Sequence, residues 1–243
     1  MRKLLERHRA EGNVFPLIGG HRGCICSYLE NTIPSMEEGI RRGADYLEID
    51  IQLTKDGIPV VFHDVEIEAM TGLPGYIHDY TYTELRNAIG LETFEDVMRW
   101  GRRNDVNFAL ELKGMTAFTD KPNLDLIHPM IEVIRGTDMF DNTEAFGIDY
   151  RLLKLVKSIE RKMDIGMIVP FIPTDPVELM KEFDAMIYLS YVFNLTPEMI
   201  RRLQNAGYFV SGAILRDMKL VDYAIESKVD MFEFDRPELI EKT

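Results

Sequence analysis

Short β-rich runs alternate with amphipathic helical patterns along almost the whole chain, and this alternation limits the possible folds more than any other feature. The stretches between the runs carry apolar residues at helical spacing, as in the stripe of Leu152, Val156 and Ile159. Eight strands separated by helices within 243 residues favour a closed (β/α)8 TIM barrel, an α/β fold. An open doubly wound sheet is less favoured, because no Gly-x-Gly-x-x-Gly segment follows the first strand. The predicted strands are residues 15–19, 46–53, 106–112, 144–148, 165–169, 186–189, 209–214 and 231–234.

One region interrupts the alternation, between the second and third predicted barrel strands. Residues 64–104 form an insertion in which 71–75 predict a loop and 84–89 and 94–102 predict helices. An insertion after the C-terminal end of a barrel strand lies over the active face and often shapes substrate access. No linker or shift in composition divides the chain, so we expect residues 1–243 to form one domain. Residues 1–13 predict a helix that closes the bottom of the barrel.

The charge of the chain limits its partners. Asp and Glu total 41 against 28 Lys and Arg, and the net charge of -13 repels nucleic acids and anionic membranes at long range. The uncharged runs are shorter than the ~20 residues that cross a bilayer, and the N-terminus lacks an apolar signal core. Cys24 and Cys26 are expected to be free thiols, although Cys-x-Cys can also hold a soft metal. We therefore expect a cytoplasmic protein with no nucleic-acid partner and no stable membrane insertion, whose oligomeric state the sequence leaves open.

Carboxylates lie on the inward faces of two predicted barrel strands. Side chains alternate along a strand, so Glu48 and Asp50 share one face, and Glu111 shares a face with Lys113. Carboxylates inside a barrel are costly unless a cation neutralises them. Three carboxylates that converge at a barrel mouth can bind a hard cation such as Mg²⁺ or Ca²⁺. They can equally pair with Lys113 and Arg22, and the spacing alone leaves both interpretations open.

Two histidines, an arginine and a lysine lie at the same predicted strand ends. His21 and Arg22 follow the first strand directly, and His63 lies near the end of the extended segment 60–64. Histidine suits acid–base chemistry near neutral pH, although a lone histidine is more often structural. Two of them beside three carboxylates favour a functional site. Arg22 and Lys113 would neutralise an anionic group, for which a phosphate is the natural candidate.

An ordered series of motifs resembles the glycerophosphodiester phosphodiesterase family. Beyond residue 113 the likeness rests on the strand–helix rhythm and on residues 229–237, which are similar to the closing Thr-Asp-x-Pro strand of the family. The resemblance implies a (β/α)8 barrel that uses a divalent metal to cleave a phosphodiester into glycerol phosphate and an alcohol. The motifs are His21-Arg22-Gly23, Glu30-Asn31-Thr32, Glu48-Ile49-Asp50, Leu53-Thr54-Lys55-Asp56-Gly57, residues 60–64 and Glu111-Leu112-Lys113.

The resemblance also implies a role for each polar residue at the strand ends. Asn31 and Thr32 are expected to cap and support the first helix, and Asp56-Gly57 to form the turn that returns His63 to the mouth. The implied site has one divalent cation, Mg²⁺ or Ca²⁺, and a small-molecule phosphodiester as substrate. Its residues are the metal ligands Glu48, Asp50 and Glu111, the catalytic acid–base pair His21 and His63, and the phosphate-binding Arg22 and Lys113.

The chain departs from the family pattern where the alcohol part of a substrate would be sensed. Ser211-Gly212-Ala213-Ile214 stands where the family has a tryptophan, Phe234 replaces the threonine of the closing motif, and the segment after Asp64 lacks Arg-Thr-Thr. These departures bear on alcohol preference rather than on the core chemistry. Two alternatives are a phospholipase D-like enzyme acting on lysolipids or sphingolipids, and a non-catalytic phosphate-binding barrel. The first is disfavoured because residues 64–80 contain no apolar docking loop, and the second because every catalytic-type position is filled.

Overall fold

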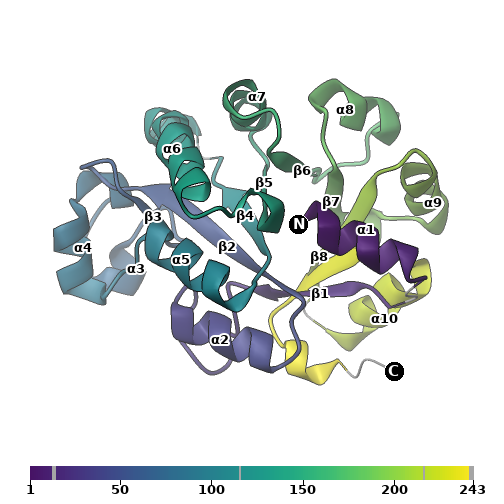
Figure 1. The fold of residues 1–243 in the computed structure, drawn as a ribbon, viewed down its shortest axis with the longest axis horizontal. Coiled ribbons are helices and arrows are strands. Elements are labelled where there is room, and N and C mark those ends of the chain that lie inside the picture. Colours follow the sequence, from purple (N-terminus) through teal and green to yellow (C-terminus); the bar gives the residue numbers. More distant parts are fainter. Residues whose placement is uncertain (13–14, 115, 216, 241–243) are drawn as a thin grey trace.

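In the computed structural model, which describes residues 1–12, 15–114, 116–215 and 217–240, parallel strands form a closed barrel. The strands follow the order β1-β9-β8-β7-β6-β5-β4-β2, and β1 pairs with β2 to close the sheet. The helices pack around the outside (Figure 1), so the predicted (β/α)8 TIM barrel is confirmed. Its parallel strands are β1 Leu17–His21, β2 Tyr46–Leu53, β4 Phe108–Leu112, β5 Thr143–Gly147, β6 Asp164–Ile168, β7 Ile187–Tyr191, β8 Phe209–Leu215 and β9 Met231–Phe234.

Most of the helices begin at a defined polar cap. A Thr or Asp side chain accepts a hydrogen bond from a first-turn backbone N–H in α2, α4, α5, α7, α8, α9 and α10. Within the described ranges, no helix is both long and apolar enough to cross a membrane. The α-helices are α1 Arg2–Ala10, α2 Ile33–Arg41, α3 Glu68–Thr71, α4 Tyr82–Ile89, α5 Phe94–Asn104, α6 Thr116–Gly136, α7 Tyr150–Ile159, α8 Pro176–Phe183, α9 Pro197–Asn205 and α10 Met218–Ser227, and short 3-10 turns are η1 Ile77–Asp79, η2 Phe140–Asn142, η3 Val192–Asn194 and η4 Pro237–Leu239.

The chain between β2 and β4 contains more than a single crossover helix. After the turn at Gly57, where φ is +79°, β3 (Pro59–Val61) pairs antiparallel with β2 and leads the chain back toward His63. The elements α3, η1 and α4 then form a small lobe at the edge of the barrel (Figure 1). Its apolar cluster includes Phe62, Ile77 and Leu85. Residues 94–104 form α5, which lies in the outer helical layer.

The first strand begins and ends two residues later than the sequence predicts. Its register with β9 starts at the pair Leu17 and Met231, and its register with β2 ends at the pair His21 and Glu48. Pairing with two neighbouring strands therefore sets the bounds of β1, and local propensity does not. This shift places His21 inside the strand rather than after it.

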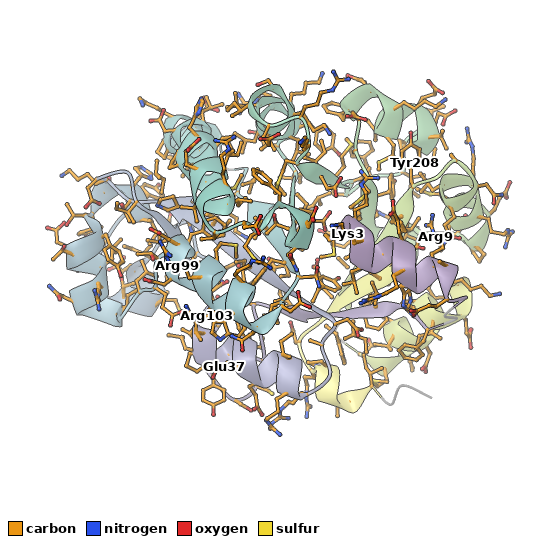
Figure 2. All side chains as sticks on the ribbon, viewed as in Figure 1. Lys3, Arg9, Glu37, Arg99, Arg103 and Tyr208 are labelled. Carbon is orange, nitrogen blue, oxygen red and sulfur yellow. The ribbon has the colours of Figure 1, made fainter. Side chains whose placement is uncertain are left out.

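Helix α1 lies across one end of the barrel (Figure 1), at the amino ends of the strands, where its Arg9 donates to the backbone oxygen of Tyr208 directly before β8 (Figure 2). Its Leu5 is fully buried and belongs to an apolar cluster with Leu17, Phe209 and Met231, which point into the barrel from their strands. The predicted bottom helix is thus confirmed over residues 2–10, whereas residue 13 lies outside the described residues. That residues 1–243 form one domain stays a prediction, and residues 241–243 are also not described.

The close packing of α5 on β4 supplies a test of the fold. A Cβ atom added at Gly101 of α5 would lie 2.3 Å from Cε2 of Phe108, a fully buried ring. We expect Gly101→Ala to lower the free energy of unfolding by about 1–3 kcal/mol, because this overpacking outweighs the gain in helix propensity. The matched control is Gly136→Ala at the end of α6, where an added Cβ meets nothing within 4 Å. Urea unfolding of the two variants would show equal stability if the packing of Gly101 were unimportant.

Candidate active site

A pocket of about 220 Å³ opens at the carboxyl ends of the barrel strands. One side of its wall is charged and the other is apolar. The charged wall comes from β1, β4 and β9 and from the segments that follow β1, β3 and β4, and the apolar wall comes from β5 to β8. The lining residues are His21, Arg22, His63, Glu111, Lys113 and Glu233 on the charged side and Phe146, Ile168, Pro170, Leu189, Tyr191 and Ala213 on the apolar side.

Three carboxylates form a cluster next to this pocket. Glu48 and Asp50 point inward from β2 because side chains alternate along a strand, and Asp50 is paired in register with Glu111 of β4. One oxygen from each of the three lies within 4.8 Å of the others. Glu48 and Asp50 are almost completely buried and do not line the pocket, whereas Glu111 does.

Two cations partly neutralise the cluster. Lys113 Nζ forms ion pairs with Asp50 and, at 3.0 Å, with Glu111 Oε2. Arg22 Nε lies 3.5 Å from Asp50 Oδ2, and its backbone N–H donates to Glu48 Oε2 at 3.1 Å. The ion pairs that the sequence left as an alternative to a metal are therefore present in part.

Burial and neighbouring charges shift the pKa values of the three carboxylates. Burial disfavours the charged form of Asp50, but Lys113, His63 and Arg22 outweigh it and lower its pKa to about 2. Burial, and next the neighbouring Asp50, raises the pKa of Glu48 well above its usual range. Burial likewise raises the pKa of Glu111, even though Lys113 opposes the shift.

These carboxylates fit a hard divalent cation. Among the described residues, the buried Oε1 of Glu48 has no hydrogen-bond partner. A buried carboxylate oxygen without a partner is costly, and burial, which raises the pKa of Glu48 and of Glu111, disfavours three charged carboxylates beside only two cationic side chains. Oxygen ligands at this spacing are those that Mg²⁺ and Ca²⁺ prefer.

His21 is oriented by a carboxylate from the far end of the chain. Its Nδ1 donates to Asp235 Oδ1 at 2.6 Å, which leaves Nε2 on the side of Glu48, 4.0 Å from Oε2. Asp235 was not among the predicted site residues, nor was Glu233, which lines the pocket from β9. Two features of the sequence could have indicated both residues: the alternation of side chains along residues 231–235, and the similarity of residues 229–237 to the closing motif of the family. Burial raises the pKa of Glu233 to about 7, and neighbouring carboxylates add to the shift.

His63 lies on the charged wall, in the segment that follows β3. Its Nδ1 lies 2.8 Å from Asp64 Oδ1, and a ligand atom of each of Glu30, His63 and Asp64 lies within 4.8 Å of the others. The side chain of Gln52 donates to the backbone oxygens of Phe62 and Asp64, both at 2.9 Å. Gln52 therefore braces the segment that carries His63. The inward face of β2 contains Gln52 as well as the two carboxylates, so the same alternation could have indicated it.

The loop after β1 places Arg22 and Asn31 by means of left-handed backbone. Their φ angles are 56° and 59°, and the Arg22 guanidinium donates to both oxygens of Glu30 at 3.0 and 3.2 Å. Asn31 does not cap α2, contrary to expectation, because its Nδ2 donates to Asp50 Oδ2 at 2.8 Å. Thr32 alone accepts the capping hydrogen bond, from the N–H of Ser35. Asn31 thus supports the carboxylate cluster directly.

The structure therefore brings the seven predicted site residues together around one pocket and its floor. Five of them line the pocket, and the two buried carboxylates of β2 lie beside four of those five, namely His21, Arg22, Glu111 and Lys113. The cysteines lie outside this lining: Cys24 is buried, Cys26 is exposed, and their Sγ atoms are 2.9 Å apart.

Comparison with known proteins identifies relatives that match either part or most of this chain. The chain is 38% identical to the uncharacterized protein YqiK of Bacillus subtilis over 108 residues, which are 40% of this chain and 44% of YqiK. It is 24% identical to a glycerophosphodiester phosphodiesterase of Caldanaerobacter subterraneus over 223 residues, which are 88% of each protein. The chain thus spans less than half of the first relative and most of the second.

Solved structures share the fold at lower identity. A phosphodiesterase of Oleispira antarctica in complex with the product sn-glycerol-3-phosphate superimposes with a TM-score of 0.83 at 23% identity, over 93% of this chain and 95% of that one. A putative glycerophosphoryl diester phosphodiesterase of Silicibacter pomeroyi has a TM-score of 0.84 at 17% identity, over 92% of this chain and 91% of that one. The model of the glycerophosphoryl diester phosphodiesterase family matches residues 21–239. The chain therefore belongs to this family of phosphoric diester hydrolases.

Proposed function

We propose that the chain hydrolyses glycerophosphodiesters to glycerol phosphate and an alcohol in a metal-dependent reaction. The observation that carries the proposal is the position of His21 and His63 on the wall of a pocket that borders the carboxylate cluster at Glu111. The solved structure from Oleispira antarctica, which holds sn-glycerol-3-phosphate, supports the choice of product class. The net charge of -13 supports a small-molecule phosphodiester rather than nucleic acid as partner, and we also propose a cytoplasmic location.

The carboxylates Glu48, Asp50 and Glu111 would hold the divalent cation, either Mg²⁺ or Ca²⁺. Such a cation supplies charge neutralisation at the phosphoryl oxygens. Asn31 fixes the orientation of Asp50, and the backbone N–H of Arg22 fixes that of Glu48. These hydrogen bonds hold the ligands in place, as partners of ligating carboxylates commonly do.

The histidines would move the two protons that phosphodiester hydrolysis requires. A base must take a proton from the nucleophile, and an acid must give one to the leaving alkoxide. In both histidines a carboxylate engages Nδ1, Asp235 at His21 and Asp64 at His63, so Nε2 is the atom left to exchange a proton.

Arg22 and Lys113 would bind the phosphate. Both line the pocket, and both already contact acidic side chains. A guanidinium has five N–H donors, so Arg22 can keep its contact with Glu30 while it donates to a phosphate oxygen. Burial opposes the charge of Lys113, but Asp50 and Glu111 raise its pKa and keep it protonated.

A second candidate is hydrolysis of lysolipids by a phospholipase D-like reaction. It is favoured by the apolar half of the pocket wall, and a lysophospholipase D of Mus musculus is 38% identical over 79 residues, 32% of this chain and 24% of the mouse protein. Faster turnover of lysophosphatidylcholine than of glycerophosphocholine by the purified, metal-loaded protein would establish this candidate. Tight binding of glycerophosphocholine without turnover of either would instead indicate a non-catalytic phosphate-binding barrel.

Removing either histidine tests the acid–base pair. We expect His21→Ala and His63→Ala each to lower kcat/KM for glycerophosphocholine by about 10²–10⁴-fold, because each removes one proton transfer. Cation affinity, measured by calorimetry, should change little because neither side chain belongs to the carboxylate cluster. His128→Ala, at an exposed position of α6, is the matched control and should keep full activity. Near-normal turnover in both site variants would contradict the proposed mechanism.

The metal proposal predicts a different pattern for the carboxylates. Glu111→Gln removes one anionic ligand, so we expect weaker cation binding and a rate that excess Mg²⁺ or Ca²⁺ partly restores. The measurement is the rate as a function of cation concentration after treatment with EDTA. Glu132→Gln on the exposed face of α6 is the control and should leave the cation dependence unchanged. Full activity of the EDTA-treated wild type would rule out a required metal.

A further inference from the structure

Large apolar side chains are exposed in three loops at the mouth of the barrel. The loops follow β5, β6 and β7, and their exposed side chains form what we call the apolar ledge. Single exposed apolar residues are common on proteins, but a group of them marks an interaction surface. The ledge consists of Ile148, Phe171, Ile172, Tyr191 and Phe193, whose exposed fractions are 48%, 53%, 67%, 43% and 69%.

These side chains belong to one sector of the rim. Strands β5, β6 and β7 are neighbours in the barrel, so their loops are adjacent. The side chain of Asn194 donates to the backbone oxygen of Pro170 at 3.4 Å and connects the second loop with the third. The rings of Tyr191 and Phe193 stack with their centroids 5.2 Å apart. The ledge is therefore supported by contacts between its loops.

The ledge continues the apolar wall of the catalytic pocket. Pro170 and Tyr191 line the pocket, and Ile168 and Leu189 line it from the same two strands, nearer to the barrel centre. An apolar surface thus runs from the pocket out to the most exposed side chains of the rim. Whatever covers the ledge also lies at the entrance of the pocket.

The ledge loops after β6 and β7 carry no charge at their tips, whereas Asp149 beside Ile148 is paired with Arg151. Residues 165–174 and 185–197 contain no Asp, Glu, Lys, Arg or His. A partner recognised through ion pairs therefore finds no counter-charge on these loops. The chain as a whole has a net charge of -13, so an anionic surface is repelled.

We propose that the apolar ledge docks the mouth of the pocket onto a lipid surface of zero net charge, such as zwitterionic phospholipid. Exposed Phe, Tyr and Ile side chains insert into the boundary between headgroups and acyl chains, and no spanning helix is required. A protein partner seated on the ledge offers the pocket no phosphodiester group. A lipid surface instead presents phosphodiester headgroups to it. This choice of occupant rests on the proposed function, whereas docking itself can be measured without turnover.

Co-sedimentation with vesicles of pure phosphatidylcholine tests the docking. We expect the full chain to bind these vesicles, and the double variant Ile172→Ser/Phe193→Ser to bind at least about tenfold more weakly, because it removes the two most exposed apolar side chains of the ledge. The matched control is Ile40→Ser, which changes an exposed apolar side chain of α2 and should not alter binding. Neither substituted ledge residue lines the pocket, so glycerophosphocholine turnover should be the same in both variants.

Several outcomes would overturn the proposal. They are an absence of vesicle binding by the wild type, equal binding by the double variant, and binding that requires an anionic lipid. Self-association of the wild type that the double variant loses, without vesicle binding, would assign the ledge to a second copy of the chain instead. Vesicle binding by a protein that does not hydrolyse glycerophosphocholine would support docking and contradict the proposed function, so the two can fail separately.

Discussion

Burial of two carboxylates on one barrel strand is the constraint on which the rest of the site depends. Glu48 and Asp50 point into the barrel from β2, where branched apolar side chains are usual. Their charge is tolerated because Lys113, Arg22 and Asn31 surround Asp50. Glu48 is less well satisfied, because the backbone N–H of Arg22 donates to its Oε2 but its Oε1 has no partner among the described residues, and burial raises its pKa. A site that keeps unbalanced negative charge in a dry interior is suited to a divalent cation.

The mouth of the barrel is divided into two chemically different halves. The charged groups come from β1, β4 and β9 and from the segments after β1, β3 and β4, and the apolar groups come from β5 to β8. A phosphodiester has the same division, with an anionic phosphoryl group and an alcohol part whose polarity varies. The charged half would act on the phosphoryl group, while the apolar half would contact the alcohol or the surface that presents it. Because these halves come from different strands, their sequences can vary independently.

Much of the fold and of the site was predictable, because both depend on local patterns. The strand–helix alternation predicted the barrel, and alternation within β2 placed Glu48 and Asp50 on one face. The bounds of β1 were not predictable in the same way, since pairing with β2 and β9 sets them. The role of Asn31 was also missed. Its position before a helix is typical of a cap, and only the folded loop shows that it reaches Asp50 instead.

The sequence by itself determined which chemical groups stand at the strand ends. Side chains alternate between the two faces of a strand, and successive barrel strands follow one another along the chain. Tertiary structure decided which of those groups meet. Asp235 reaches His21 across 214 residues only because closure of the barrel places β9 beside β1. Exposure of the ledge was likewise decided by the fold. Phe171 and Phe193 are of a residue type that is usually buried, and they are exposed because they follow the carboxyl ends of β6 and β7, where no other element of the described residues covers them.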